Sequence, residues 1–475
     1  MTSTRLDVGK ASNEARKLLD EFKSEQIKNR ELYKLIRAVR MREEDVDPEL
    51  RRLVEMMYRG FVINGLDIAE ESTRGRFKVI QDRISHLATE FQRNRTADAG
   101  HIWFTLDQLD GAPKDVLSSL ELDQGENEGK VKINLDDYNH CKVSTSVKDS
   151  ETRQKFEFAT SNKCAQNVPL LKEVVVLRAE AAKLLGYESH AALRLEDRMA
   201  KTPETVIAFL EGLRSRLVGK LNRKDFEARG ESFDNCSYPW YYAFYNRQLV
   251  KEEYSVDMKK VGEYFEVHTT MQKILKNFEE LFGLQFHDIR RQDAVVWDEE
   301  ALGGGFLGYL YLDLFDREGS VMESITWYPK LNTQPPKIIP DEIVAGIVGS
   351  KYCGKPGFLL GQVLFALVDI KMHLHQDTET GKCMDLTREY NEMVTEIQMF
   401  NVPRYRADWA SPFVLSSHFM EEYNAGYYSY LLAEGRRYWT VLLEKGGSQD
   451  EMKTLKEFLG RDPSIEPFYK DLALD

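Results

Sequence analysis

The helical spacing of apolar residues constrains the fold of this chain more than any other feature. Phe77 is followed by Ile80, Ile84, Leu87 and Phe91 at alternating spacings of three and four residues. Side chains at this spacing form one apolar stripe along an amphipathic helix. We therefore expect long helices to dominate the fold.

Two further segments carry signals for helix ends. Residues 170–186 have a similar apolar spacing and end at Gly186, a residue type that often follows the last helical turn. Thr202, Pro203 and Glu204 predict the start of another helix. They supply a cap, a residue suited to the first turn and an acid near the positive helix end.

Strand signals are confined to three short segments. Alternation and aromatic or β-branched content favour strands at His101–Thr105, Lys130–Leu135 and Gly308–Leu314. With so few strands beside many helices, the sequence predicts a mostly α protein with a small β-sheet.

Charge and cysteine content narrow the class of partner and the compartment. A net charge of −13 argues against a general nucleic-acid binder, which needs a clustered basic excess, and favours a peptide or protein partner.

The N-terminus lacks the apolar core of a signal peptide, and no apolar run is long enough for a membrane span. The five cysteines are scattered without a Cys-x-x-Cys pair. We therefore expect a cytoplasmic protein with free thiols that binds neither nucleic acid nor a membrane.

Several segments resemble one known family in their order and spacing. They read FTLDQLDGAP at residues 104–113, LRAEAAKLLGY at 177–187, LGYLYLDLFDREG at 307–319, HFMEEYNAGYYSY at 418–430, GGS at 446–448 and FLGR at 458–461. Together they resemble the thimet oligopeptidase family of zinc metallopeptidases, which includes saccharolysin and neurolysin. The resemblance covers nearly the whole chain.

The resemblance implies a mostly helical, two-lobed fold with a deep channel, in which a monomeric enzyme cuts short peptides with one Zn²⁺ ion. Three regions are expected. Residues 1–160 form an N-terminal helical region with small strands, and residues 161–319 form a helical middle whose strand leads to the active-site region. Residues 320–475 form a C-terminal helical region with a tyrosine-rich loop.

The zinc ligands of the family are missing from this chain. The family uses H-E-x-x-H, with two histidines one helical turn apart and a glutamate base between them, followed by a third ligand on the next helix. No two of the nine histidines here are four positions apart, and H-E-x-x-H does not occur. The family carries this block between R-E-G and a helix with M-L-E-x-W. Here Arg317-Glu318-Gly319 runs almost directly into Val321-Met322-Glu323. No residue is therefore assigned as a metal ligand.

A second contraction follows Glu434, where the family continues its helix for several more turns. The flanks still match well at both junctions. Gradual decay would blur the flanks, so clean edges favour a skipped coding segment or a recent deletion.

The tyrosine-rich loop holds the remaining candidate site residues. By resemblance, His418, Tyr423 and Tyr430 bind substrate and stabilise the oxyanion, and Tyr427, Tyr428 and Gly426 contact substrate. The alternative is a packed aromatic helix face, because tyrosine buries well with its hydroxyl at an edge. Glu422 stands where the family has glycine, which should stiffen the loop.

One other cluster is rich in histidine. It comprises His373, His375, Asp377 and Glu379. Helical positions two apart point to different faces, so we favour a solvated helix end over a metal site here.

Three hypotheses stay open at this point. The product is a zinc metalloendopeptidase acting on short peptides if it contains the missing block. Otherwise it is a non-catalytic relative, a pseudoenzyme that binds peptides or another protein. The third hypothesis is a truncated product that folds poorly, because the helices around the lost block would expose apolar faces.

Overall fold

A computed structural model shows the fold. It describes residues 25–42, 47–98, 100–118, 120–220, 238–256, 267–282, 339–374, 384–400, 409–421 and 423–431, with a few scattered residues elsewhere. The chain divides into two compact units. The main unit comprises Ile27–Glu253 and Ser350–Asp475, and the smaller unit comprises Met1–Gln26 and Tyr254–Gly349.

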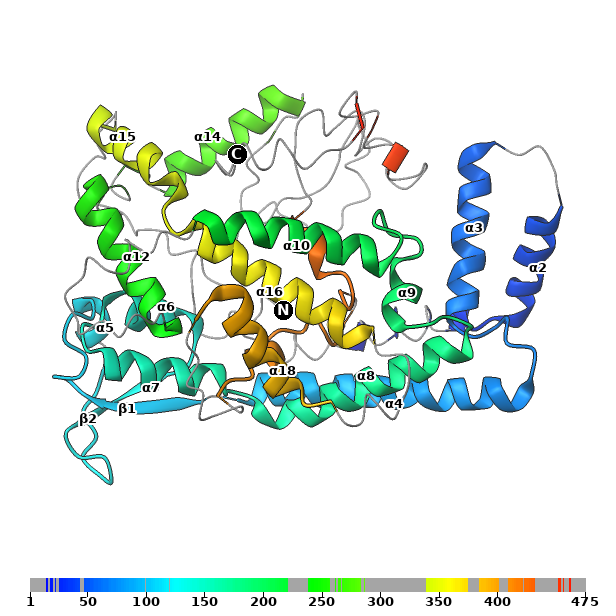
Figure 1. The fold of residues 1–475 in the computed structure, drawn as a ribbon, viewed down its shortest axis with the longest axis horizontal. Coiled ribbons are helices and arrows are strands. Elements are labelled where there is room, and N and C mark those ends of the chain that lie inside the picture. The colour runs from blue at the N-terminus through cyan, green and yellow to red at the C-terminus, as the bar shows by residue number, and fades with distance from the viewer. Residues whose placement is uncertain are drawn as a thin grey trace, which may run out of the picture. The chain divides into compact units, whose positions relative to one another are not determined.

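Helices make up most of the described residues of the main unit (Figure 1). The helices are α2 (Arg30–Met41), α3 (Pro48–Ile63), α4 (Glu71–Ala97), α5 (Lys114–Ser118), α6 (Asp137–Ser146), α7 (Ser150–Ser161), α8 (Val168–Leu184), α9 (His190–Leu195), α10 (Pro203–Lys220), α12 (Pro239–Tyr254), α16 (Lys355–His373) and α18 (Leu386–Met393). Short helical turns are η1 (Ala165–Asn167), η2 (Ser350–Tyr352), η3 (Val394–Gln398), η4 (Pro412–Val414) and η5 (Tyr427–Leu431). The smaller unit contains α14 (Val267–Phe282) and α15 (Asp341–Gly349).

The helices predicted from apolar spacing are confirmed. The stripe predicted between Phe77 and Phe91 lies on α4, where it faces the core with Ile80 and Leu87 fully buried. The 170–186 prediction corresponds to α8, and α10 begins at Pro203 as expected. α4 and α8 lie side by side (Figure 1).

A two-stranded antiparallel sheet joins β1 (His101–Thr105) to β2 (Lys130–Asn134). On β2 the alternating residues Val131 and Ile133 are buried, and they pack in a small core with Phe104 of β1 and Phe156 of α7. Two of the three predicted strands are thereby confirmed. The third, Gly308–Leu314, lies outside the described residues.

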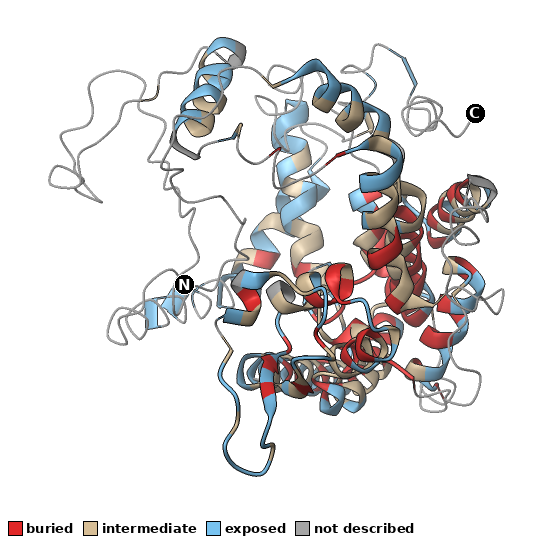
Figure 2. Ribbon diagram, turned by 90° about the vertical axis from the view of Figure 1, so that its left-hand side faces the viewer, coloured by how far each residue is buried: buried red, intermediate tan, exposed pale blue. Residues whose placement is uncertain are grey.

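The larger core of the main unit lies around α16. This helix contacts α10, α8, α9, α18, η3 and η5, and Figure 1 shows it beside α10. Most positions of α16 from Leu359 to His373 are buried, as expected for a helix enclosed by others. Figure 2 marks the buried residues in red. Asp369, at 0% exposure, is a charged residue inside this apolar helix.

The prediction of a mostly α protein with a small sheet is confirmed. The two-lobed arrangement, the channel and the three-region division stay predictions. Within the part of the chain that the structure describes, no helix combines the length and apolar character needed to cross a membrane.

Candidate functional site

Three tyrosine side chains of the tyrosine-rich loop meet around the imidazole of His418. Its ring centroid lies 5.3 Å from that of Tyr423, 5.5 Å from Tyr427 and 5.7 Å from Tyr430. The Nε2 atom of His418 is 3.1 Å from the Tyr430 hydroxyl. We call His418, Tyr423, Tyr427 and Tyr430 the aromatic cluster.

The aromatic cluster has an inner side and an outer side. Tyr427 is partly buried, and its hydroxyl donates to Gln362 Oε1 of α16 at 3.1 Å. Tyr423 and Tyr430 stack at 5.6 Å between centroids and are 48% and 49% exposed. Burial and the neighbouring Tyr423 raise the pKa of Tyr430, so its hydroxyl stays protonated at neutral pH. The outer side therefore presents hydroxyl groups and ring faces together.

The structure does not bring Tyr428 into the aromatic cluster. It is 4% exposed and packs in the large core, where burial raises the pKa of its hydroxyl. The reason is the 3₁₀ geometry of η5, in which residues three apart share a face. Tyr427 and Tyr430 share one face, whereas Tyr428 and Leu431 share the buried one. Tyr428 therefore fits the interpretation as a packed aromatic face, whereas Tyr423 and Tyr430 are exposed enough to contact a ligand.

Gly426 shapes the loop from a buried position. Its N–H donates to the Tyr423 carbonyl at 2.7 Å, and a Cβ atom there would lie 3.0 Å from the same oxygen. The turn lies between Tyr423 and Tyr427, both of which contact His418. For Gly426 and Tyr428, a role as substrate contacts stays a prediction. Glu422 lies outside the described residues.

A buried polar network lies beneath the aromatic cluster. Arg178 of α8 donates to the carbonyls of Phe419 and Met420, each at 2.6 Å, and contacts His373 Nε2 at 3.1 Å. Because a guanidinium only donates, His373 Nε2 must accept, and its Nδ1–H donates to the Asp369 carbonyl at 2.8 Å. His373 is therefore neutral in this arrangement. Burial lowers the pKa of Arg178 to about 9. Because this value is still above neutral pH, the guanidinium stays charged there.

Asp369 holds the other end of the loop. Its Oδ1 accepts the Ala425 N–H at 2.8 Å, and its Oδ2 accepts the Tyr427 N–H at 3.1 Å. A second histidine, His190 of α9, meets Asn424 Oδ1 at 2.6 Å through Nε2. We call Arg178, Asp369 and His373 the buried network.

The expectation that His373 lies at a solvated helix end was wrong. His373 is 2% exposed, because the last turn of α16 packs against α8 and the tyrosine-rich loop. The four-residue spacing of Asp369 and His373 on an apolar helix was the signal that could have revealed this pair. The other members of the predicted cluster, His375, Asp377 and Glu379, lie outside the described residues.

The buried histidines predict a loss of stability in mild acid. Burial is the main cause that lowers the pKa of His373, and it lowers that of His190 well below the ordinary value of 6.5. Unfolded chains take up these protons near pH 6.5, whereas the folded chain does not. The contribution of these histidines to the free energy of unfolding is therefore greatest above pH 6.5. It falls below that pH, by up to about 1.4 kcal/mol per pH unit for each histidine.

Urea unfolding at pH 7.5, 6.5 and 5.5 measures this effect. The variant His373→Gln keeps a neutral donor and acceptor, so it should show a shallower fall between pH 6.5 and 5.5. Equal stability of the unmodified chain at pH 7.5 and 5.5 would contradict the expectation.

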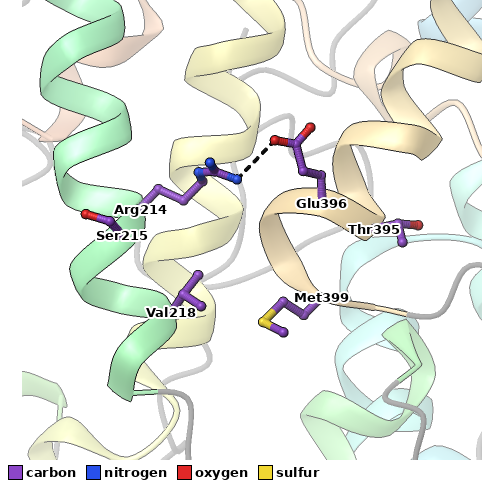
Figure 3. Close-up of a pocket in the computed structure, with 6 residues that line it drawn as sticks. All are labelled: Arg214, Ser215, Val218, Thr395, Glu396 and Met399. Carbon is purple, nitrogen blue, oxygen red and sulfur yellow. Dashed lines mark hydrogen bonds and ion pairs between the residues drawn. The ribbon is translucent and has the colours of Figure 1, made fainter.

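A separate pocket of about 460 Å³ lies between α10 and η3 (Figure 3). It is lined by Arg214, Ser215, Val218, Thr395, Glu396 and Met399. Arg214 and Glu396 form an ion pair of 3.1 Å across it, and Arg214 also meets Glu211 at 2.6 Å. These charged groups therefore form ion pairs with one another inside the pocket.

The residues present do not fit the zinc site that the resemblance implies. The full sequence has no H-E-x-x-H. Among the described residues, no three His, Cys, Asp or Glu side chains gather in a way that could hold a metal ion. The polar groups near His418 are hydroxyls and an imidazole, which suit hydrogen bonding to a ligand.

Comparison with known proteins confirms the resemblance. The chain is 25% identical to oligopeptidase PhomG' of Diaporthe leptostromiformis over 98% of this chain, and it spans 50% of that protein's length. It is 24% identical to oligopeptidase PhomG of the same organism, over 98% of this chain and 89% of the relative. Saccharolysin of Saccharomyces cerevisiae is 24% identical over 92% of this chain and 80% of its own length.

These alignments contain large gaps in this chain. The PhomG alignment runs over 638 positions, which exceeds the 475 residues of the chain by 163. The family model for peptidase family M3 matches in two parts, residues 143–320 and 319–435. The break falls at the junction after Gly319, and the second part ends at the contraction after Glu434. Since the two parts together cover more than half of the chain, this protein belongs to peptidase family M3.

Proposed function

We propose that this chain is a peptide-binding member of peptidase family M3 that holds short peptides at the aromatic cluster and lacks the residues for zinc-dependent hydrolysis. The observation that carries the proposal is the pair of half-exposed tyrosines, Tyr423 and Tyr430, gathered with His418 on a loop anchored from below.

Peptide recognition suits the chemistry of this surface. Tyrosine hydroxyls donate hydrogen bonds to peptide carbonyls, and ring faces bury apolar side chains. In a peptidase, donors in such positions stabilise an oxyanion. Without a metal to lower the pKa of water, the same donors bind a ground-state carbonyl and no bond is cut.

A binding measurement with a fluorescently labelled peptide tests the proposal. Tyr423→Phe and Tyr430→Phe each remove one hydroxyl and keep the ring. Each should weaken binding by about 2- to 12-fold, the worth of one net hydrogen bond. Tyr187→Phe is the matched control, because its hydroxyl meets Glu196 at 2.6 Å outside the aromatic cluster. The control should bind like the unmodified chain.

Two results would contradict the proposed function. One is the absence of binding at high micromolar peptide. The other is equal affinity of the Tyr423, Tyr430 and Tyr187 variants.

A zinc metalloendopeptidase acting on short peptides is the second candidate. The observation that favours it is the break of the family match at Gly319, between the two parts of the chain that match the family model. Sequencing the transcript across the codons for Gly319 to Met322 decides the matter. An in-frame segment encoding H-E-x-x-H would make the longer product the candidate enzyme. An uninterrupted junction would leave the peptide-binding proposal for the chain as written.

The proposal includes a monomer located in the cytoplasm. Light scattering on the purified chain and fractionation of cells test these two points.

A further inference from the structure

We propose that Asp369 and Arg178 act as positioning residues that together clamp both ends of the segment from Phe419 to Tyr427 and so set the geometry of the aromatic cluster. This inference rests on the proposed function for its effect on peptide binding. Its structural part, the clamp itself, is testable without any peptide.

The contacts of the clamp fall next to cluster residues. Arg178 binds the carbonyls of Phe419 and Met420, which directly follow His418. Asp369 binds the N–H groups of Ala425 and of Tyr427 itself. Each end of the segment is therefore tied to the core helices α8 and α16 beside a side chain of the aromatic cluster.

The Asp369 end also holds an unfavourable backbone conformation. Ala425 has a φ of 55°, in the left-handed region that residues with a Cβ atom rarely adopt. Such conformations persist where surrounding contacts hold them in place. The Ala425 N–H is bound by Asp369, and the turn lets Tyr423 and Tyr427 both reach His418.

Charge explains why this position carries a carboxylate. Asp369 and Arg178 are both buried, at 0% and 5% exposure, and the Asp369 charge favours the charged form of Arg178. A charge-assisted bond to a backbone N–H is stronger than a neutral one. A carboxylate accepts at two oxygens, whereas a side-chain amide accepts at only one. Asparagine at position 369 could serve only one of the two N–H groups.

Hydrogen–deuterium exchange with residue-level fragmentation tests the clamp in the absence of peptide. In the unmodified chain, the amides of Ala425 and Tyr427 should exchange slowly for a loop. In Asp369→Asn, at least one of them should exchange about 10- to 100-fold faster, because a charged hydrogen bond is lost. Peptide affinity should fall by about 10-fold in the same variant.

The chain offers a closely matched control. Asp98 also accepts two backbone N–H groups, those of Cys164 at 2.8 Å and Gly100 at 3.0 Å. Asp98→Asn makes the same chemical change at a carboxylate with no bond to the loop. It should speed exchange at Cys164 and Gly100 and leave Ala425, Tyr427 and peptide affinity unchanged.

The possible outcomes separate the clamp from the proposed function. Fast exchange of Ala425 and Tyr427 in the unmodified chain would overturn the clamp even if the variant fails to fold. Unchanged exchange in Asp369→Asn, or equal acceleration in Asp98→Asn, would overturn it as well. If exchange responds as expected and the unmodified chain binds no peptide, the clamp stands and the proposed function fails. If exchange responds and affinity does not fall, the positioning role in binding is overturned.

Discussion

The purified chain is expected to cleave short peptides no faster than zinc-containing buffer alone. Enzymes usually accelerate their reactions by at least ~10⁶-fold, so the expected deficit against a working peptidase is very large. The reason is chemical: no histidine pair at helical spacing exists to hold a metal that would activate water. A quenched fluorescent peptide and mass spectrometry of the products measure this directly.

Contaminating proteases are the main risk in that assay, so activity must be followed across a size-exclusion column. Cleavage that coelutes with the chain, disappears with a chelator and returns with zinc would contradict the expectation.

Replacing Arg178 with alanine is expected to lower the free energy of unfolding by about 3–5 kcal/mol, the usual cost of leaving a buried charge without the group that compensates it. The change removes the positive charge that interacts electrostatically with the buried Asp369 carboxylate, and it leaves the carbonyls of Phe419 and Met420 without the Arg178 donors. Urea unfolding followed by circular dichroism gives the difference.

Arg76→Ala provides the comparison for an exposed pair. Arg76 of α4 meets Glu180 of α8 at 2.6 Å and is 51% exposed, so its loss should cost at most about 1 kcal/mol. Equal losses in the free energy of unfolding would show that the buried contacts of Arg178 stabilise the protein no more than an exposed ion pair does. A broad, non-cooperative transition in the unmodified chain would instead support the hypothesis of poor folding.

The main helices of the fold could be predicted because their signals are local. The stripe from Phe77 to Phe91 and the Pro203 helix start are properties of adjacent residues, and the structure places α4 and α10 there. The strands at His101–Thr105 and Lys130–Leu135 were predicted from alternation and from aromatic or β-branched content, and the structure has them at His101–Thr105 and Lys130–Asn134. Each of these elements is then stabilised when its apolar residues pack against the core.

The candidate site was only partly visible from the sequence. Proximity in the chain and family resemblance were enough to group His418 with the tyrosines. They could not separate Tyr428, because the assignment of faces depends on the 3₁₀ turn that η5 adopts. The contact between Arg178 and His373 was hidden for a different reason. It joins α8 to α16 across nearly 200 residues of sequence, and only tertiary packing brings them together.

The zinc content of the purified protein shows whether this chain holds the metal on which the chemistry of the family depends. The purified chain is incubated with zinc, dialysed against metal-free buffer and analysed by mass spectrometry of the elements. The expected result is far less than one zinc per chain. One zinc per chain that survives dialysis would show that this chain has a zinc site and would direct attention to residues 375–379.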